Sequence, residues 1–241
     1  MKKETYILSL IFGVFFGCAT VLNAQIQPAV YISESENSRH ELKIDDNYMV
    51  YTEYRQSPPE FIRTLGGFSS IEGADDKRLV VLLEFNSNYE KDSLRTLSIP
   101  LQIEGKNLIL DWTQKMTFTP LPVPKEKQAL DGQWLFATRG PADGQERRGE
   151  ENPRKTLKFL QDGRFHWVAY NTDTFEFFGT GGGSFSSKDG RYVENIDFFS
   201  RDNARVGATL EFDYEIKNGD WHHTGKNSKG EPLYEIWALR E

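Results

Sequence analysis

Alternation of apolar and polar residues is the clearest pattern in this chain. Between Ala208 and Ile216 every second residue is apolar or aromatic, and the residues between them are polar. This period of two is typical of a β-strand with one face on a core and the other toward water. Similar runs fill the second half of the chain, and turn pairs ending in glycine, such as Asp189-Gly190 and Asn218-Gly219, separate them. The pattern predicts about eight antiparallel strands in up-and-down order. No stretch has the apolar period of a long helix, which argues against a βαβ fold.

The first half of the chain repeats the order of features of the second half. LKIDDNYMVYTEY, FIRTLGGFSS and RLVVLLEF precede LKFLQDGRFHWVAY, FFGTGGGSFSS and RYVENIDF. The alignment pairs Leu42 with Leu157, Tyr54 with Tyr170, Phe68 with Phe185 and Trp112 with Trp221. Chance similarity is the alternative, because glycine-rich turns are common in β-rich proteins. The repeat predicts two tandem domains, at 25–119 and 130–241, each long enough for a core of its own. Alternating prolines mark an extended spacer at 120–129.

Eight meandering strands have no free edges when they close into a barrel. Gly132-Gln133-Trp134 on the first strand of the second domain and Trp237-Ala238-Leu239-Arg240 on its last resemble the lipocalin (calycin) pattern. Residues 130–241 are similar to a lipocalin-like domain of unknown function in secreted bacterial proteins. The resemblance implies an all-β protein of two tandem lipocalin-like up-and-down antiparallel β-barrels. It also implies that Gly132, Trp134 and Arg240 close the second barrel, with Arg240 stacked over Trp134. The first domain has Ala29-Val30-Tyr31 in place of the motif and is expected to be a diverged copy.

The first 24 residues have the layout of a secretory signal peptide. Lys2 and Lys3 precede an uncharged, mostly apolar run that ends at Ala24. Cleavage after Ala24 predicts a secreted or periplasmic protein without a transmembrane segment. Lipid attachment at Cys18 and a retained membrane anchor are the alternatives. Cys18 is the only cysteine, so the cleaved chain has no disulfide.

Charge and residue supply exclude several functions. The 241 residues include 29 basic and 36 acidic side chains, a net charge of -7, which argues against nucleic-acid binding. Four histidines and a single cysteine argue against a metal site, and we expect His222 and His223 to be polar turn residues. The run from Gly179 to Ser184 lacks the lysine and helix of a phosphate loop and the GxSxG of a serine nucleophile. We therefore expect a bend or bulge there, and a protein that is no enzyme and has no cofactor.

The interior of the second barrel is the predicted ligand site. Its expected lining is Phe165, Trp167, Tyr192, Glu194, Phe212, Tyr214 and Trp221. Pockets of this kind are mostly apolar with a few placed polar groups, so a small, mostly apolar ligand is expected. Glu194 would then be either a polar anchor for the ligand or a hydrogen-bond partner of a nearby Tyr or Arg.

Two other functions remain open at this point. One is an envelope protein-interaction module with filled barrels. The other is a calycin-type enzyme that uses Glu194 near His166 or Tyr170. The charged segment Arg139–Arg154 joins the first two strands of the second domain, and it is either a lid or partner-binding loop or a solvated insertion.

Overall fold

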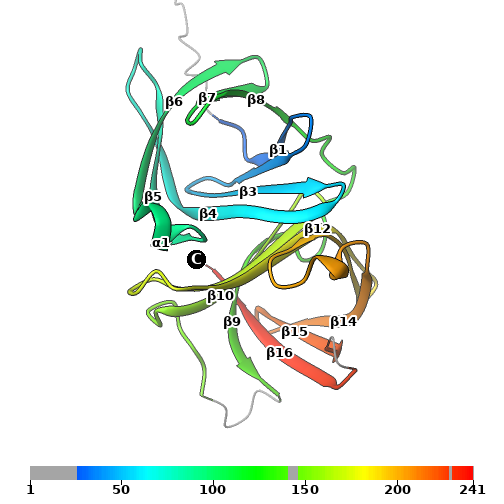
Figure 1. Ribbon diagram of the computed structural model, residues 1–241. Coiled ribbons are helices and arrows are strands. Elements are labelled where there is room, and N and C mark those ends of the chain that lie inside the picture. Colours follow the sequence, from blue (N-terminus) through cyan, green and yellow to red (C-terminus); the bar gives the residue numbers. More distant parts are fainter. Residues whose placement is uncertain (1–25, 141–145, 228–229, 241) are drawn as a thin grey trace, which may run out of the picture.

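The chain folds into two closed eight-stranded β-barrels (Figure 1). This computed structural model describes residues 26–140, 146–227 and 230–240, so the expected leader with Cys18 and Ala24 lies outside it. The first barrel comprises β1 (Ala29–Glu34), β2 (Arg39–Ile44), β3 (Tyr48–Gln56), β4 (Pro59–Glu72), β5 (Arg78–Asn86), β6 (Thr96–Glu104), β7 (Asn107–Asp111) and β8 (Lys115–Pro120). The second comprises β9 (Gly132–Arg139), β10 (Arg154–Gln161), β11 (Arg164–Asn171), β12 (Phe177–Lys188), β13 (Arg191–Phe199), β14 (Thr209–Lys217), β15 (Asp220–Lys226) and β16 (Pro232–Leu239). The short helix α1 (Tyr89–Asp92) and the 3-10 turn η1 (Asn203–Arg205) are the helical elements among the described residues.

Each strand pairs antiparallel with the next, and the last strand of each barrel pairs with the first. In the first barrel Tyr31 of β1 lies opposite Pro120 of β8. In the second, Trp134 of β9 lies opposite Leu239 of β16. The predicted all-β fold of two tandem up-and-down barrels is therefore confirmed. The proline-rich spacer lies between the end of β8 and the start of β9.

Irregularities in the sheets show how the two barrels correspond. The register shifts just before Tyr54 in β3 and just before Tyr170 in β11. It shifts again between two glycines at the same distance along the next strand, at Gly66-Gly67 in β4 and at Gly182-Gly183 in β12. Matching bulges in matching strands make the internal repeat a property of the fold as well as of the sequence.

Of the four residue pairs expected from the sequence alignment, these bulges support only Tyr54 with Tyr170. Leu42 belongs to the interior of the first barrel, whereas Leu157 faces outward in the second. Phe68 is exposed and Phe185 is buried. Both pairs are one position out of register, and in a strand one position exchanges the two faces. Trp112 follows β7, whereas Trp221 lies inside β15, so this pair is also wrong.

The second glycine of each pair has no space for a side chain. A Cβ on Gly67 would lie 2.0 Å from the carbonyl oxygen of Leu82, and a Cβ on Gly183 would lie 1.8 Å from that of Asn195. Both contacts are with backbone, which cannot move aside cheaply. The glycine-rich run of β12 is therefore a bulge site, as its sequence predicts.

The two barrels share a buried interface in which the Glu84 carboxylate of β5 accepts hydrogen bonds from three side chains. Arg240, beyond the end of β16, donates to both Glu84 oxygens at 2.9 and 3.0 Å. The hydroxyls of Tyr48 and Tyr170 donate to Oε2 at 2.7 and 2.9 Å. In Figure 1 the C-terminus correspondingly lies between the barrels. Although burial by itself raises the pKa of Glu84, the hydrogen bonds and charge of Arg240 hold it below its ordinary value.

A second buried ion pair crosses the same interface. Arg164 of β11 donates to Glu41 of β2 from Nε at 3.1 Å and from Nη2 at 2.7 Å. Lys43 lies 3.0 Å from the other oxygen of Glu41. Burial by itself raises the pKa of Glu41, but the charges of Arg164 and Lys43 outweigh this effect and lower the pKa to about 2. Apolar side chains surround these charges, in a cluster of residues from both barrels: Tyr48, Val50, Phe85, Leu135, Leu157, Phe159, Val168 and Tyr170.

A bulge between β12 and β13 changes which side chains of β13 face the interior of the barrel. The bulge at Gly183 leaves Asp197 without a partner in β12, because Gly182 pairs with Phe198 and Gly183 with Ile196. Phe198 therefore packs on Tyr54 of the first barrel. An uninterrupted period of two would have placed Phe198 on the same face as Tyr192 and Ile196, so that interpretation of the sequence is wrong. An extra residue in a strand inverts the alternation beyond it.

His166, buried in the interface, should make the protein sensitive to acid. Burial, reinforced by Lys43, lowers the pKa of His166 to about 3. The unfolded chain binds a proton near pH 6.5 and the folded one does not, so stability is present above pH 6.5 and is lost as pH falls toward 3. Between pH 7 and 5 this group should remove about 2 kcal/mol from the free energy of unfolding. Urea unfolding of wild type and His166→Gln at both pH values measures the effect. A wild-type pH dependence in the variant would contradict it.

Candidate binding site in the second barrel

The interior of the second barrel contains a cavity of about 830 Å³. That volume lies within the range of small-molecule sites. In the first barrel the space between Leu42, Leu110 and Met116 is about 10 Å³, too little to admit a ligand. A hollow of about 670 Å³ lies against Ile44 and Leu79 of the same barrel, beside the turn residues Asp45 and Asp46. Leucine, isoleucine, valine, methionine and aromatic side chains fill that barrel. The two repeats therefore have the same fold but different interiors.

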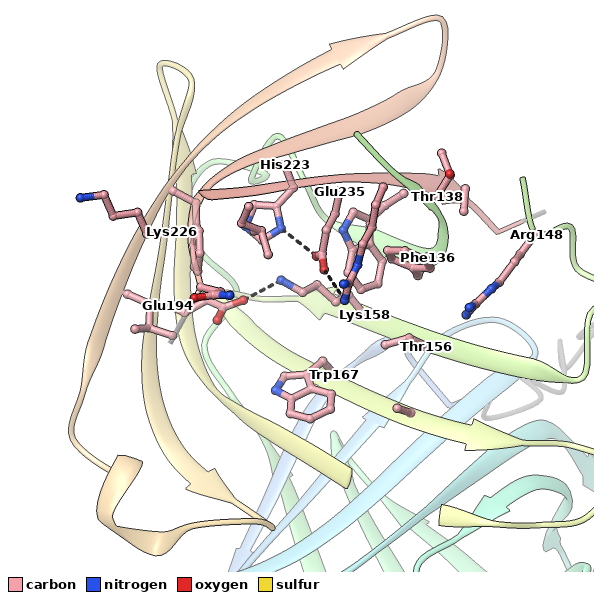
Figure 2. A pocket seen from close by; sticks show the side chains of 18 of the residues that line it. Phe136, Thr138, Arg148, Thr156, Lys158, Trp167, Glu194, His223, Lys226 and Glu235 are labelled. Carbon is pink, nitrogen blue, oxygen red and sulfur yellow. Dashed lines mark hydrogen bonds and ion pairs between the residues drawn. The ribbon is translucent and has the colours of Figure 1, made fainter. Parts of the chain in front are cut away.

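A buried ion pair lies at the wall of this cavity. Lys158 of β10 donates to Glu194 of β13 at 2.8 Å (Figure 2). The Tyr192 hydroxyl donates to the same oxygen at 2.8 Å. Both charged side chains are less than a tenth exposed. The Lys158 ammonium also lies 5.0 Å from the ring centroid of Trp221 and 5.3 Å from that of Trp237. Cation–π attraction and the carboxylate together replace the water that this ammonium has lost.

A second polar pair, His223 of β15 and Glu235 of β16, faces the same cavity (Figure 2). His223 Nδ1 lies 3.6 Å from a Glu235 oxygen, beyond hydrogen-bond distance, and neither ring nitrogen has a hydrogen-bond partner among the described residues. Burial, followed by the charge of Lys158, lowers the pKa of His223. A neutral imidazole with free nitrogens can donate to one ligand atom and accept from another. The buried indole N–H of Trp237 is a further donor, and it too has no partner in the described part of the chain.

The first barrel has apolar residues at all four of these positions. The register of the paired strands relates Leu42 to Lys158, Val81 to Glu194, Leu110 to His223 and Met116 to Glu235. For example, Leu110 lies opposite Met116 as His223 lies opposite Glu235. All four apolar residues belong to the core of the first barrel. A barrel of this kind therefore closes without these charges. Because burying charged groups costs free energy, their presence in the second barrel indicates a function.

Three of the seven side chains expected to line the site do so: Trp167, Glu194 and Phe212. Phe165, Tyr192 and Trp221 are fully buried in the aromatic core of the barrel. Tyr214 is half-buried and packs on that core from β14. Of the two alternatives for Glu194, the structure shows the hydrogen bond to a tyrosine, with Lys158 as an additional partner.

The predicted stacking of Arg240 over Trp134 is wrong. Trp134 faces the interior, where its indole N–H donates to the Leu130 carbonyl at 2.9 Å. The Arg240 guanidinium instead lies 4.6 Å from the ring centroid of Tyr48 in the first barrel. Because Leu239 is opposite Trp134, Arg240 is displaced by one residue and points to the other side of the sheet. Gly132 begins β9, and a side chain there would approach Leu239.

The groups proposed to assist Glu194 in catalysis lie on the other side of the sheet. His166 contacts Thr180 and Phe198, and Tyr170 donates to Glu84 of the first barrel, so neither faces the cavity with Glu194. His222 and His223 lie on opposite faces of β15, as neighbouring strand residues must, and are not turn residues. Among the described residues, no group of three or more His, Cys, Asp or Glu is placed to hold a metal ion.

Sequence reasoning missed Lys158, His223 and Glu235. The alternation in β10 was misleading, because Leu157 and Phe159, the neighbours of Lys158, are the more apolar residues and face the other barrel.

The charged segment Arg139–Arg154 joins β9 to β10, as expected, and its Glu146 and Arg148 line the cavity.

The protein thus consists of two tandem closed β-barrels, and the polar-lined cavity lies in the second. No protein-family model matches the chain, and no curated protein matches it. In the portion described by the structure, no helix has both the length and the apolar character needed to cross a bilayer.

Proposed function

We propose that this chain is a lipocalin-like binding protein whose second barrel holds a small molecule with an apolar body. The observation that supports this best is the contrast between equivalent positions. Lys158, Glu194, His223 and Glu235 line a cavity of about 830 Å³ in the second barrel, whereas Leu42, Val81, Leu110 and Met116 belong to the packed core of the first. Trp167, Phe212 and Trp237 provide flat apolar surface on the cavity wall. Apolar walls with a few fixed polar groups are the usual composition of a small-molecule site.

The first barrel, in this proposal, supports the second. Its core is filled, and one face is buried against β10 and β11 of the second barrel. The expected signal peptide would place the protein outside the cytoplasm, where a carrier or sensor of a small molecule would act. We propose no catalytic activity.

A neutral aromatic probe tests the site. N-phenyl-1-naphthylamine should bind the full chain once, with a Kd in the micromolar range, and should quench tryptophan fluorescence because Trp167 and Trp237 line the cavity. Thr156 also lines it, so Thr156→Trp should fill the space and weaken binding at least about tenfold. Ser70→Trp, at an exposed position of β4, should leave binding unchanged.

Native mass spectrometry of protein purified from its own compartment provides an independent readout. A small molecule that co-purifies with wild type and not with Thr156→Trp would support the proposal. If the probe does not bind saturably and only a protein partner co-purifies, the alternative of an interaction module replaces it.

A further inference from the structure

The mouth of the cavity is cationic, although the protein as a whole is acidic. Seven basic and three acidic side chains line the cavity among the described residues, whereas the chain has 29 basic and 36 acidic residues. Lys158 is neutralised by Glu194, and Arg139 lies near Glu235. The excess positive charge therefore belongs to four arginines and one lysine: Arg148, Arg154, Arg201, Arg205 and Lys226.

Three of these arginines are held in place by aromatic side chains. Arg148 lies 5.3 Å from the ring centroid of Phe136, and Arg201 lies 5.7 Å from that of Trp167. Arg154 stacks 3.2 Å above the ring of Phe178. Stacking leaves the edge of a guanidinium, where its N–H groups point, free to bind another group.

Contacts with the backbone add to this fixation. Arg201 donates from Nε and Nη2 to the Phe178 carbonyl at 2.9 and 2.7 Å, so Arg154 and Arg201 are both anchored at Phe178. The backbone N–H of Arg148 donates to the carbonyl of Ala137, which is the extra residue at a bulge in β9. The arginines are thereby arranged before any ligand arrives, which lowers the entropy cost of binding.

Within the described part of the chain, these three guanidinium groups have no ion-pair partner. No carboxylate of the described residues lies within 4.0 Å of the guanidinium nitrogens of Arg148, Arg154 or Arg201 in an ion pair. Nη1 of Arg154 is buried and has no hydrogen-bond partner among the described residues. Burial and the nearby charges of Arg148 and Arg201 lower the pKa of Arg154, although Glu176 acts in the opposite direction. Like charges this close are costly unless an anion joins them.

We propose that Arg148, Arg154 and Arg201 form an anion-binding subsite at the mouth of the second barrel, and that the ligand is an amphiphile with a carboxylate or phosphate group. Its apolar body enters the barrel toward Trp167 and Phe212, and its anionic group stays between the arginines. This inference rests on the proposed function of the second barrel. Guanidinium groups suit both acids, because each offers paired oxygens for parallel N–H donors.

Two probes that differ only in a sulfonate group test this subsite. 8-Anilino-1-naphthalenesulfonate should bind at least about tenfold more tightly than neutral N-phenyl-1-naphthylamine. Raising NaCl from about 20 to about 500 mM should weaken the sulfonate probe and not the neutral one. Arg148→Gln and Arg154→Gln should each weaken the sulfonate probe about tenfold and leave the neutral probe within about twofold. Arg191→Gln removes a charge from the outer surface and should change neither affinity.

Displacement of the bound probe distinguishes the acids. Dodecanoate or dodecyl phosphate should displace it more effectively than dodecanol, and the better of the two identifies the acid. If the neutral probe binds but the sulfonate confers no advantage, or if the arginine variants behave as Arg191→Gln does, the anion subsite is overturned and the proposed function stands. If neither probe binds, the proposed function itself has failed.

Discussion

Replacing Arg240 by methionine is expected to lower the free energy of unfolding by about 3–5 kcal/mol, since breaking one partner of a buried ion pair leaves the other charge uncompensated. The uncompensated charge would be the Glu84 carboxylate, which would keep only the hydrogen bonds from the hydroxyls of Tyr48 and Tyr170. Arg240 also packs on the rings of Tyr48 and Phe68, so the loss includes a stacking contribution. Urea denaturation monitored by far-UV circular dichroism measures the change.

A double-mutant cycle identifies the partner of Arg240. Arg240→Met and Glu84→Gln should cost less together than the sum of the single losses, because the two side chains are in contact. Arg240→Met and Trp134→Phe should add within about 0.3–0.5 kcal/mol, because Trp134 faces the interior of the second barrel. Coupling to Trp134 but not to Glu84 would contradict the interface described above. Arg191→Gln, on the surface, serves as the control for loss of an exposed arginine.

The second large effect is expected from introducing first-barrel residues into the second barrel. Lys158→Leu alone should destabilise the protein by about 3–5 kcal/mol, because Glu194 would stay buried with only the Tyr192 hydroxyl. Lys158→Leu with Glu194→Val reproduces Leu42 and Val81 of the first barrel and removes both charges. A buried ion pair replaced by apolar side chains is often neutral or stabilising by about 1–4 kcal/mol.

Stability and binding should therefore separate in the double variant. We expect it to unfold at the wild-type urea concentration or above, and to bind N-phenyl-1-naphthylamine at least about tenfold more weakly. If the double variant is as unstable as Lys158→Leu, the ion pair is a structural requirement of the second barrel. If it is stable and binds normally, the pair has no part in ligand binding.

The sequence by itself determined the all-β class and the tandem arrangement of two barrels. Strict alternation such as that from Ala208 to Ile216 is possible only in strands, and Asp-Gly and Asn-Gly pairs end strands because their residues tolerate positive φ. The bulge between β12 and β13 was also readable, because it lies at a run of glycines, where there is no room for a Cβ. These are local properties, and local geometry does not depend on what lies across the sheet.

Only the tertiary structure decided which face of each strand is inside. Alternation reveals the interior when the other face meets water, but in β10 and β11 the other face meets the first barrel. Leu157 and Phe159 then look like core residues, and Lys158 looks like a surface residue, although the cavity is on the side of Lys158. Bulges invert the order again beyond Gly183, which moved Phe198 out of the barrel and Phe199 into the cavity wall. Arg240 binds Glu84 rather than Trp134 for the same reason. Contacts between the two barrels depend on how the barrels pack, and the alternation within one strand does not encode that packing.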